Sequence, residues 1–126
     1  MTSVLNVDTI ADKAGTGPVG LTKQSASKFR VHHSGDTPTT NESFNMSSLT
    51  DNANGDYTYA FTNSFNTAYY SSSAMSTEDG TIGYVTMYYD RSYTRSASNL
   101  RIQGIDQTDS FDDGAFTSAV SHGDLA

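Results

Sequence analysis

The sequence contains no cysteine and no tryptophan, only two prolines, and only seven Lys and Arg residues against fourteen Asp and Glu. The absence of cysteine excludes disulfides and also thiolate sites for catalysis or zinc. The net charge of -7 and the scattered basic residues leave no positive stripe for phosphates, so we expect no nucleic-acid partner. Neither an apolar run as long as a membrane span nor the pattern of a secretory signal is present, so we expect neither.

The residues that are abundant are typical of a polar β protein. Hydrophobic residues make up 35% of the chain, and the aromatic residues are eight Tyr and six Phe. Tyr, Phe, Thr and Val favour half-buried strands, whereas Leu, Glu and Lys, which favour helices, are scarce. A length of 126 residues suits one domain with one core. We therefore expect a single all-β domain with almost no helix.

Alternation of apolar and polar residues marks the strands of this domain. Phe29 and Val31 alternate with polar neighbours, and a second strand is expected over Glu42–Leu49, with Phe44 and Met46 pointing inward. The other expected strands are Asp56–Thr62, which forms a hairpin with the strand before it, Tyr69–Met75, Thr81–Tyr89, Ala97–Ile105, and a closing strand marked by Phe116, Ser118 and Val120. About six or seven such strands predict an antiparallel β-sandwich, jelly-roll-like, or a small barrel, and we take the sandwich as the expected fold.

The pattern of the first ten residues predicts an extended strand that must be covered by another part of an assembly. Apolar side chains fall on both faces of a strand over Val4–Ile10, and Gly15-Thr16-Gly17-Pro18 then forms a turn. A strand of this kind needs cover on both sides, so we expect residues 1–25 to form an anchoring arm and residues 26–126 to form the head domain. The expected anchoring residues are Val4, Leu5, Val7, Ile10, Val19 and Leu21.

Motifs that carry catalysis are missing from the sequence. It contains no Gly-x-Ser-x-Gly elbow for a nucleophilic serine, and no His-Glu-x-x-His pair for a catalytic zinc. The sequence also offers no paired carboxylates on a recognisable cleft, as a glycosidase needs. We therefore predict a protein that is not an enzyme, with no catalytic residue and no cofactor.

Three places invite a metal ion, and each has a plainer interpretation. His32 and His33 are adjacent, so their side chains point to opposite sides of a strand; they are solvent-facing or capping residues, unless three copies of one His meet on a threefold axis and bind an ion. The loop Asp51–Asp56 lacks oxygen ligands at the positions that calcium requires, which favours a hairpin turn. An acidic cluster suits an ordinary loop as well as an ion site: Asp106, Asp109, Asp112 and Asp113. We predict no bound metal and leave His32, His33 and the Asp106–Asp113 loop open.

Several tyrosines near strand ends are candidates for contact with a sugar or a protein partner, because an aromatic ring with a hydroxyl suits both. Since the chain has no Trp and few large aliphatic residues, tyrosine is also needed for the core or for a subunit interface, and we favour these roles for most of them. The candidates for partner contact are Tyr69, Tyr70, Tyr88, Tyr89 and Tyr93.

Several segments resemble tail fibre and related surface appendage proteins of tailed bacteriophages, particularly aquatic phages. The opening Leu5–Ile10 with Gly15-Thr16-Gly17 is similar to the start of many such proteins. Segments of the body look like the β domain that often closes these fibres: Ser43–Asp51, Gly55–Thr58, Phe61-Thr62, Ala68–Tyr70, Leu100–Ile102 and Ala119–Asp124.

The resemblance implies a virion structural protein, made in the host cytoplasm and placed on the particle surface. Its expected partners are two further copies in a homotrimer, the capsid, portal, tail or fibre-attachment proteins that hold its N-terminal arm, and a host receptor. Fibres normally have a long shaft between arm and head, and only about fifteen residues intervene here. A capsid decoration (cement) protein that binds the major capsid protein uses the same parts, and it is the alternative.

Overall fold

The structure is a computed structural model that describes residues 27–77, 84–88, 96–106 and 108–125. In this part of the chain the regular elements are eight strands. They are β1 (Phe29–Ser34), β2 (Thr39–Phe44), β3 (Met46–Ala53), β4 (Asp56–Phe61), β5 (Ser71–Thr77), β6 (Tyr84–Tyr88), β7 (Asn99–Ile105) and β8 (Phe116–His122). The described residues include no helix long and apolar enough to span a membrane. The expected all-β class is confirmed.

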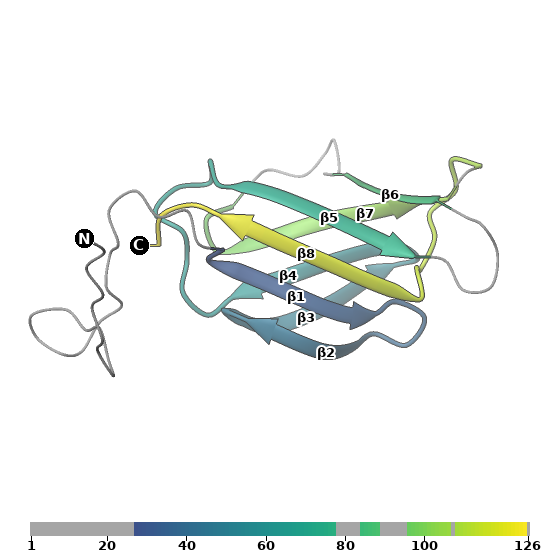
Figure 1. Ribbon diagram of the computed structural model, residues 1–126, viewed down its shortest axis with the longest axis horizontal. Helices are drawn as coiled ribbons and strands as arrows, with labels where there is room; N and C mark the ends of the chain where they lie inside the picture. Colours follow the sequence, from purple (N-terminus) through teal and green to yellow (C-terminus); the bar gives the residue numbers. More distant parts are fainter. Residues whose placement is uncertain (1–26, 78–83, 89–95, 107, 126) are drawn as a thin grey trace, which may run out of the picture.

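The strands form two antiparallel sheets that pack face to face (Figure 1). One sheet has the order β2-β1-β8-β5 and the other has the order β7-β4-β3. β6 pairs with β5 near its start and with β7 near its end, so it links the two sheets along one side. The fold is thus the antiparallel β-sandwich that the sequence predicts, while the expected arm and the proposed boundary after residue 25 lie outside the described residues.

Aromatic rings fill the space between the two sheets. Inward positions of β1, β4 and β7 alternate with outward ones, which places one row of large side chains from each strand in the core. The rings of Phe61 and Phe65 meet edge to face, with centroids 5.0 Å apart, a favoured aromatic geometry. The buried apolar residues are Phe29, Val31, Tyr57, Tyr59, Phe61, Phe65, Tyr70, Leu100, Ile102 and Ala119.

The closing strand β8 turns its small residues inward and its larger apolar residues outward. Thr117, Ala119 and Ser121 are buried, and the two hydroxyl groups among them pair with serines of β5 at 2.8 and 2.6 Å. Small side chains fit this position because the facing space is occupied by the large rings of β4. The strand itself is confirmed, but the pattern that marked it in the sequence, including Phe116 and Val120, belongs to the outer face of the sandwich.

The expected strand over Glu42–Leu49 is wrong in one respect, because the chain changes sheets in its middle. β2 ends at Phe44 and β3 begins at Met46, and Asn45 between them has a positive φ of 58°. Phe44 was expected to point inward and is instead 49% exposed. Asparagine adopts this left-handed conformation more readily than most residues, which allows a one-residue corner.

The Asn45 side chain fastens this corner to two other segments. Its Nδ2 donates to the carbonyl oxygens of Lys28 and Asn63 at 2.9 and 3.0 Å, and its Oδ1 accepts from the Asn63 N–H at 2.7 Å. The Asn45 carbonyl also accepts from the Thr62 N–H. One side chain therefore joins the start of β1, the corner and the end of β4.

Replacing Asn45 separates the two contributions of this residue. Asn45→Gly keeps the backbone conformation but loses three side-chain hydrogen bonds, and we expect it to lower the free energy of unfolding by about 2–3 kcal/mol. Asn45→Ala loses the same bonds and adds left-handed strain, so we expect a further loss of about 1 kcal/mol. Urea unfolding of both variants measures the difference, and equal stabilities would contradict the role of the corner conformation.

Candidate functional site

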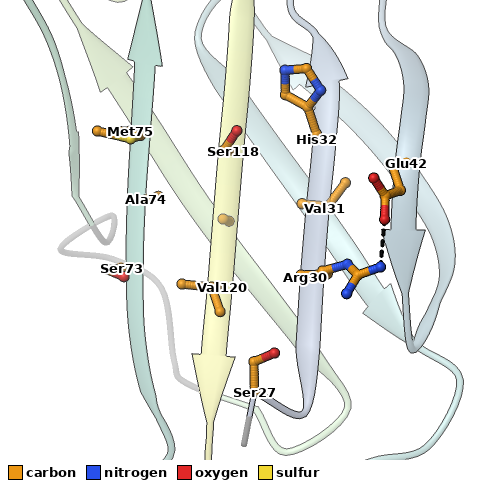
Figure 2. A pocket seen from close by; sticks show the side chains of 11 residues that line it. Ser27, Arg30, Val31, His32, Glu42, Ser73, Ala74, Met75, Ser118 and Val120 are labelled. Carbon is orange, nitrogen blue, oxygen red and sulfur yellow. Dashed lines mark hydrogen bonds and ion pairs between the residues drawn. The ribbon is translucent and has the colours of Figure 1, made fainter.

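The outer face of the β2-β1-β8-β5 sheet carries a groove, called here the β8 groove (Figure 2). It has a volume of about 440 Å³, within the range of ~300–1,000 Å³ that is common for ligand clefts. Strand register places its outward side chains in rows, because His32 pairs with Ser118, and Ser118 with Met75. The lining residues are Ser27, Arg30, Val31, His32, Glu42, Ser73, Ala74, Met75, Ser118, Ala119 and Val120.

Exposed apolar side chains surround this groove. Met75 is 70% exposed, and Phe116, which lines a second hollow next to it, is 54% exposed. The His32 ring stacks on the Phe116 ring with centroids 5.7 Å apart, which extends the flat apolar surface across β1 and β8. Exposed apolar side chains gathered on one face of a sheet are typical of a binding face.

The charges at the groove are limited to one ion pair among its lining residues. Arg30 of β1 and Glu42 of β2 pair with each other at one side, as Figure 2 shows, and both side chains are largely exposed. Such a surface pair contributes little to stability, but it leaves no net charge at the groove. The lining thus favours an uncharged, apolar occupant.

The described chain begins at one end of the groove. Ser27 lines it, and the next residue, Lys28, donates its N–H to the Ser121 carbonyl at 2.9 Å before β1 starts. At the same end of β8, Nδ1 of His122 is covered yet has no hydrogen-bond partner among the described residues. Ser27, the first described residue, therefore lies at the end of the groove where β8 ends.

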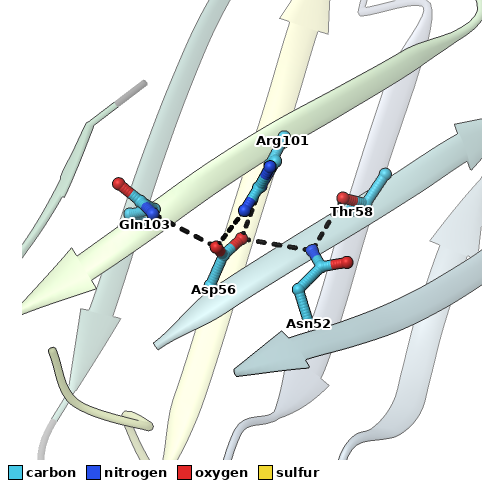
Figure 3. A network of polar contacts seen from close by, with 5 residues as sticks. All are labelled: Asn52, Asp56, Thr58, Arg101 and Gln103. Atoms are coloured by element: carbon cyan, nitrogen blue, oxygen red, sulfur yellow. Dashed lines mark hydrogen bonds and ion pairs between the residues drawn. The ribbon is translucent and has the colours of Figure 1, made fainter. Parts of the chain in front are cut away.

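The outer face of the opposite sheet is polar and internally paired (Figure 3). The Asp56 carboxylate of β4 accepts from Nε and Nη2 of Arg101 at 2.8 and 2.5 Å, and from the amides of Gln103 and Asn52, both at 3.1 Å. Burial alone raises the pKa of Asp56, but the hydrogen bonds from Arg101, Gln103 and Asn52 outweigh it and hold the pKa below its ordinary 3.8. These groups satisfy one another, so this face lacks the apolar character of the groove.

The distal end is the set of connections farthest from Ser27: the β1–β2 turn at 35–38, the β3–β4 turn at Asn54–Gly55, and the β7–β8 loop at 106 and 108–115 (Figure 1). Asp113 Oδ1 accepts from the Gly55 N–H at 2.6 Å and from the Tyr57 hydroxyl at 2.5 Å. Asn54 Nδ2 donates to the Phe111 carbonyl, and the Phe111 side chain is 48% exposed. The loop is held in one arrangement and presents an aromatic side chain to solvent.

His33 was expected to be solvent-facing or capping, and this expectation is wrong. Its side chain is fully buried and packs edge-on against the Tyr57 ring, with centroids 4.6 Å apart. Nδ1 donates to the Ser34 carbonyl at 3.0 Å, so in the neutral ring Nε2 accepts from the Tyr59 hydroxyl at 2.9 Å. His32 lies on the opposite side of the strand, as expected. Two hydrogen bonds thus satisfy both nitrogens of the buried imidazole.

Burial lowers the pKa of His33 below its ordinary value, and the nearby charge of His32 lowers it further. The hydrogen bond to the Ser34 carbonyl and the charges of Asp113 and Asp51 raise the pKa, but they do not outweigh burial. In the unfolded chain the imidazole binds a proton near pH 6.5, its ordinary pKa. In the folded chain it binds a proton only at lower pH. Stability is therefore fully present above pH 6.5 and falls as pH drops toward the folded pKa.

The melting temperature should accordingly decline between pH 6.5 and pH 5, before most carboxylates begin to titrate. His33→Gln retains groups that can hydrogen-bond but does not titrate, so its melting temperature should be nearly flat over this interval. Calorimetric scans at closely spaced pH values measure the slope. His32→Gln serves as the matched control and should keep the decline; an unchanged slope in His33→Gln would count against the assignment.

The acidic cluster is divided among separate structural roles. Asp106 accepts from Thr108 and from the Ser110 N–H, which lowers its pKa, while Asp113 bonds to Gly55 and Tyr57. Among the described residues, no three His, Asp or Glu side chains come together as metal ligands would. Asp51 to Asp56 makes the end of β3 and a turn, as the hairpin interpretation predicts.

The candidate tyrosines have different environments. Tyr69 is 89% exposed beside a small hollow of about 190 Å³ that Asn66 and Asp124 also line, so it is accessible to a partner. Tyr70 is 3% exposed and donates to the Asn99 carbonyl. It belongs to the core, and its side chain is not accessible to a partner in this structure. The remaining candidates lie outside the described side chains: Tyr88, Tyr89, Tyr93, and the anchoring residues Val4, Leu5, Val7, Ile10, Val19 and Leu21.

The β8 groove is the feature that sequence reasoning missed. Its signal was present in the alternation of Phe116, Ser118 and Val120, but alternation does not say which face of a strand is covered. Comparison of the chain with protein-family models, with curated proteins and with solved structures finds no match.

Proposed function

We propose that the chain is a non-enzymatic structural protein of a bacteriophage virion, a homotrimeric surface appendage anchored to the particle by residues 1–25. One observation carries this proposal: the two outer faces of the sandwich are unequal. The face that begins at Ser27, where the arm joins the head, is apolar and grooved, whereas the opposite face is polar and internally paired. Such asymmetry is expected of a subunit that buries one flank in an assembly.

A role in assembly, not catalysis, agrees with the way the ionisable groups are used. His33, Asp56 and Asp113 each bond to groups that hold strands or loops together. An active site requires such groups to converge on a cleft where a reacting atom can sit. The side chains that line the β8 groove include one charged pair, Arg30 and Glu42, already bonded to each other.

The distal end supports contact with a host surface. Because the arm enters at the other end of the sandwich, the distal loops are the part that would face away from the particle (Figure 1). These loops are fixed by Asp113 and Asn54 and carry the exposed Phe111. A loop that is already ordered loses little entropy on binding, which favours recognition.

The same architecture favours capsid decoration as the second candidate. The first strand of the sandwich, β1, begins at Phe29, so an arm formed by residues 1–25 and held by the particle would keep the sandwich close to the surface. A cement protein needs this proximity, whereas a fibre gains reach from a shaft.

Sedimentation of the purified chain tests the trimer, and quantitative gels of particles separate the two roles. We expect a mass near three times 13.5 kDa. A few trimers per particle would support an appendage, and hundreds of copies would support decoration. A stable monomer at micromolar concentration would overturn the trimer, and absence from purified particles would overturn the virion role.

A further inference from the structure

We propose that the β8 groove binds residues 18–22 of a neighbouring copy of the chain, so that each subunit gives one segment and receives one. The inference rests on the proposed homotrimer and names the contact that would hold it together. In this arrangement Val4–Ile10 holds the particle, whereas Val19 and Leu21, which the sequence analysis counted among the anchoring residues, bind the neighbouring subunit instead.

The chemistry of the groove selects this segment from the residues that precede the head. A groove on one sheet covers a bound strand from one side only, so its occupant should have one apolar face. Val19 and Leu21 alternate with Gly20 and Thr22, which gives one such face and one small or polar face. Val4–Ile10 carries apolar side chains on both faces and would leave one of them in water.

Charge agrees with the same choice. Pro18-Val19-Gly20-Leu21-Thr22 has no charged residue, so docking beside the self-paired Arg30 and Glu42 buries no unpaired charge.

Chain direction favours a neighbour's groove over the subunit's own. β1 runs along the groove from Phe29 toward His32, and Ser27 precedes it, so the chain enters at the end opposite His32 (Figure 2). Docking in its own groove would require the chain to reverse within residues 22–26, where Ser25 is the one residue of the types that dominate turns. In the extended direction the six residue steps from Leu21 to Ser27 span up to ~20 Å, which would carry the segment away from its own groove and toward an adjacent subunit.

Mutual exchange of this kind produces a closed assembly. A contact between two different patches forms rings when the rotation closes, and each subunit then has its groove filled. Sheet edges are poorer alternatives, because the register of both edge pairings, β1–β2 and β3–β4, is interrupted by irregularities that disfavour strand addition.

Photo-cross-linking of the full-length chain tests the proposal. The photoreactive amino acid p-benzoylphenylalanine is placed at Met75 in the groove, and at Thr50 on the opposite outer face as the control. Equal amounts of isotopically heavy and light chains are refolded together, irradiated, digested with trypsin and analysed by mass spectrometry. Cleavage at Lys13 and Lys23 separates the peptide 14–23 from the peptide 1–13.

We expect cross-links from position 75 to peptide 14–23 in mixed heavy–light pairs, and none from position 50. Leu21→Asp should lower their yield about tenfold, equivalent to ~1.4 kcal/mol, whereas Leu21→Met should retain it. Cross-links within one chain, to peptide 1–13, or between two grooves would each overturn the assignment.

Sedimentation of the same samples keeps the two proposals apart. A trimer without the cross-link to peptide 14–23 overturns the groove assignment alone and leaves the proposed function standing. A monomer overturns both, because no neighbouring copy is then bound.

Discussion

Gly55→Ala is expected to lower the free energy of unfolding by about 3–5 kcal/mol, the combined scale of left-handed strain and overpacking. Gly55 has a φ of 67°, and an added Cβ would lie 2.7 Å from the carbonyl oxygens of both Asp112 and Gly104. Both contacts are with backbone, so no flexible side chain can move aside. Because small domains are stable by only ~5–15 kcal/mol, the variant should lose much of its stability.

The loss should be accompanied by loosening of the distal end. Gly55 accepts from the Gly104 N–H at 2.7 Å and donates to Asp113, so its displacement disturbs the β3–β4 turn and the β7–β8 loop together. Urea unfolding gives the stability, and hydrogen exchange gives the local protection of residues 108–114. The neighbouring change Asn54→Ala removes one side-chain hydrogen bond and should cost about 1 kcal/mol; a similar small loss for Gly55→Ala would refute the steric argument.

Sequence predicted the strands whose two faces differ most in chemistry. β4 alternates Tyr57, Tyr59 and Phe61 with polar or small residues, and β7 places Leu100 and Ile102 in the same way. In both strands the large apolar row faces the core, because the opposite row is polar enough to stay outside. Pattern and burial therefore agree, and the sandwich follows from them.

Sequence failed where both rows of a strand carry similar chemistry or where one residue changes the path. In β8, Phe116 and Val120 are larger than Thr117, Ala119 and Ser121, yet the smaller residues are inside, because the rings of β4 already fill the core. The corner at Asn45 has no neighbouring Gly or Pro that would predict a turn there. Its conformation is fixed by hydrogen bonds to Lys28 and Asn63, which are distant in sequence.

The candidate site could not be predicted from the sequence, because the pattern does not say which face of a strand is covered. The β8 groove is lined by residues of four strands, β1, β2, β5 and β8, which come from distant parts of the chain. Its apolar rim consists of residues that the alternation rule assigns equally well to a core. His33 shows the opposite error: a residue type that is often exposed is buried because the Ser34 carbonyl and the Tyr59 hydroxyl lie within hydrogen-bonding distance. Such partners become visible only when the register of the strands is known.

Asp56→Asn should also destabilise the head strongly, by about 2–3 kcal/mol at pH 7, because hydrogen bonds to charged groups contribute on that scale. The side chain of Asp56 is only 7% exposed, and that of Arg101 is 31% exposed. An amide at this position cannot accept both guanidinium bonds, and its NH2 group meets the donors of Arg101 or Gln103. The exposed Asp36 in the β1–β2 turn is the matched site, and Asp36→Asn should change stability by less than about 0.5 kcal/mol.

The pH dependence gives this last prediction a second readout. Because the folded pKa of Asp56 lies below its ordinary 3.8, the stability it contributes is fully present above that value and is lost as pH falls through the folded pKa. The gap between the wild-type chain and Asp56→Asn should therefore stay constant from pH 7 to pH 5 and shrink below about pH 3.8. Urea midpoints at pH 7, 5 and 3 measure the gap. A difference in stability that stays the same at pH 3 would mean that the charge of the carboxylate contributes nothing to stability through the polar contacts drawn in Figure 3.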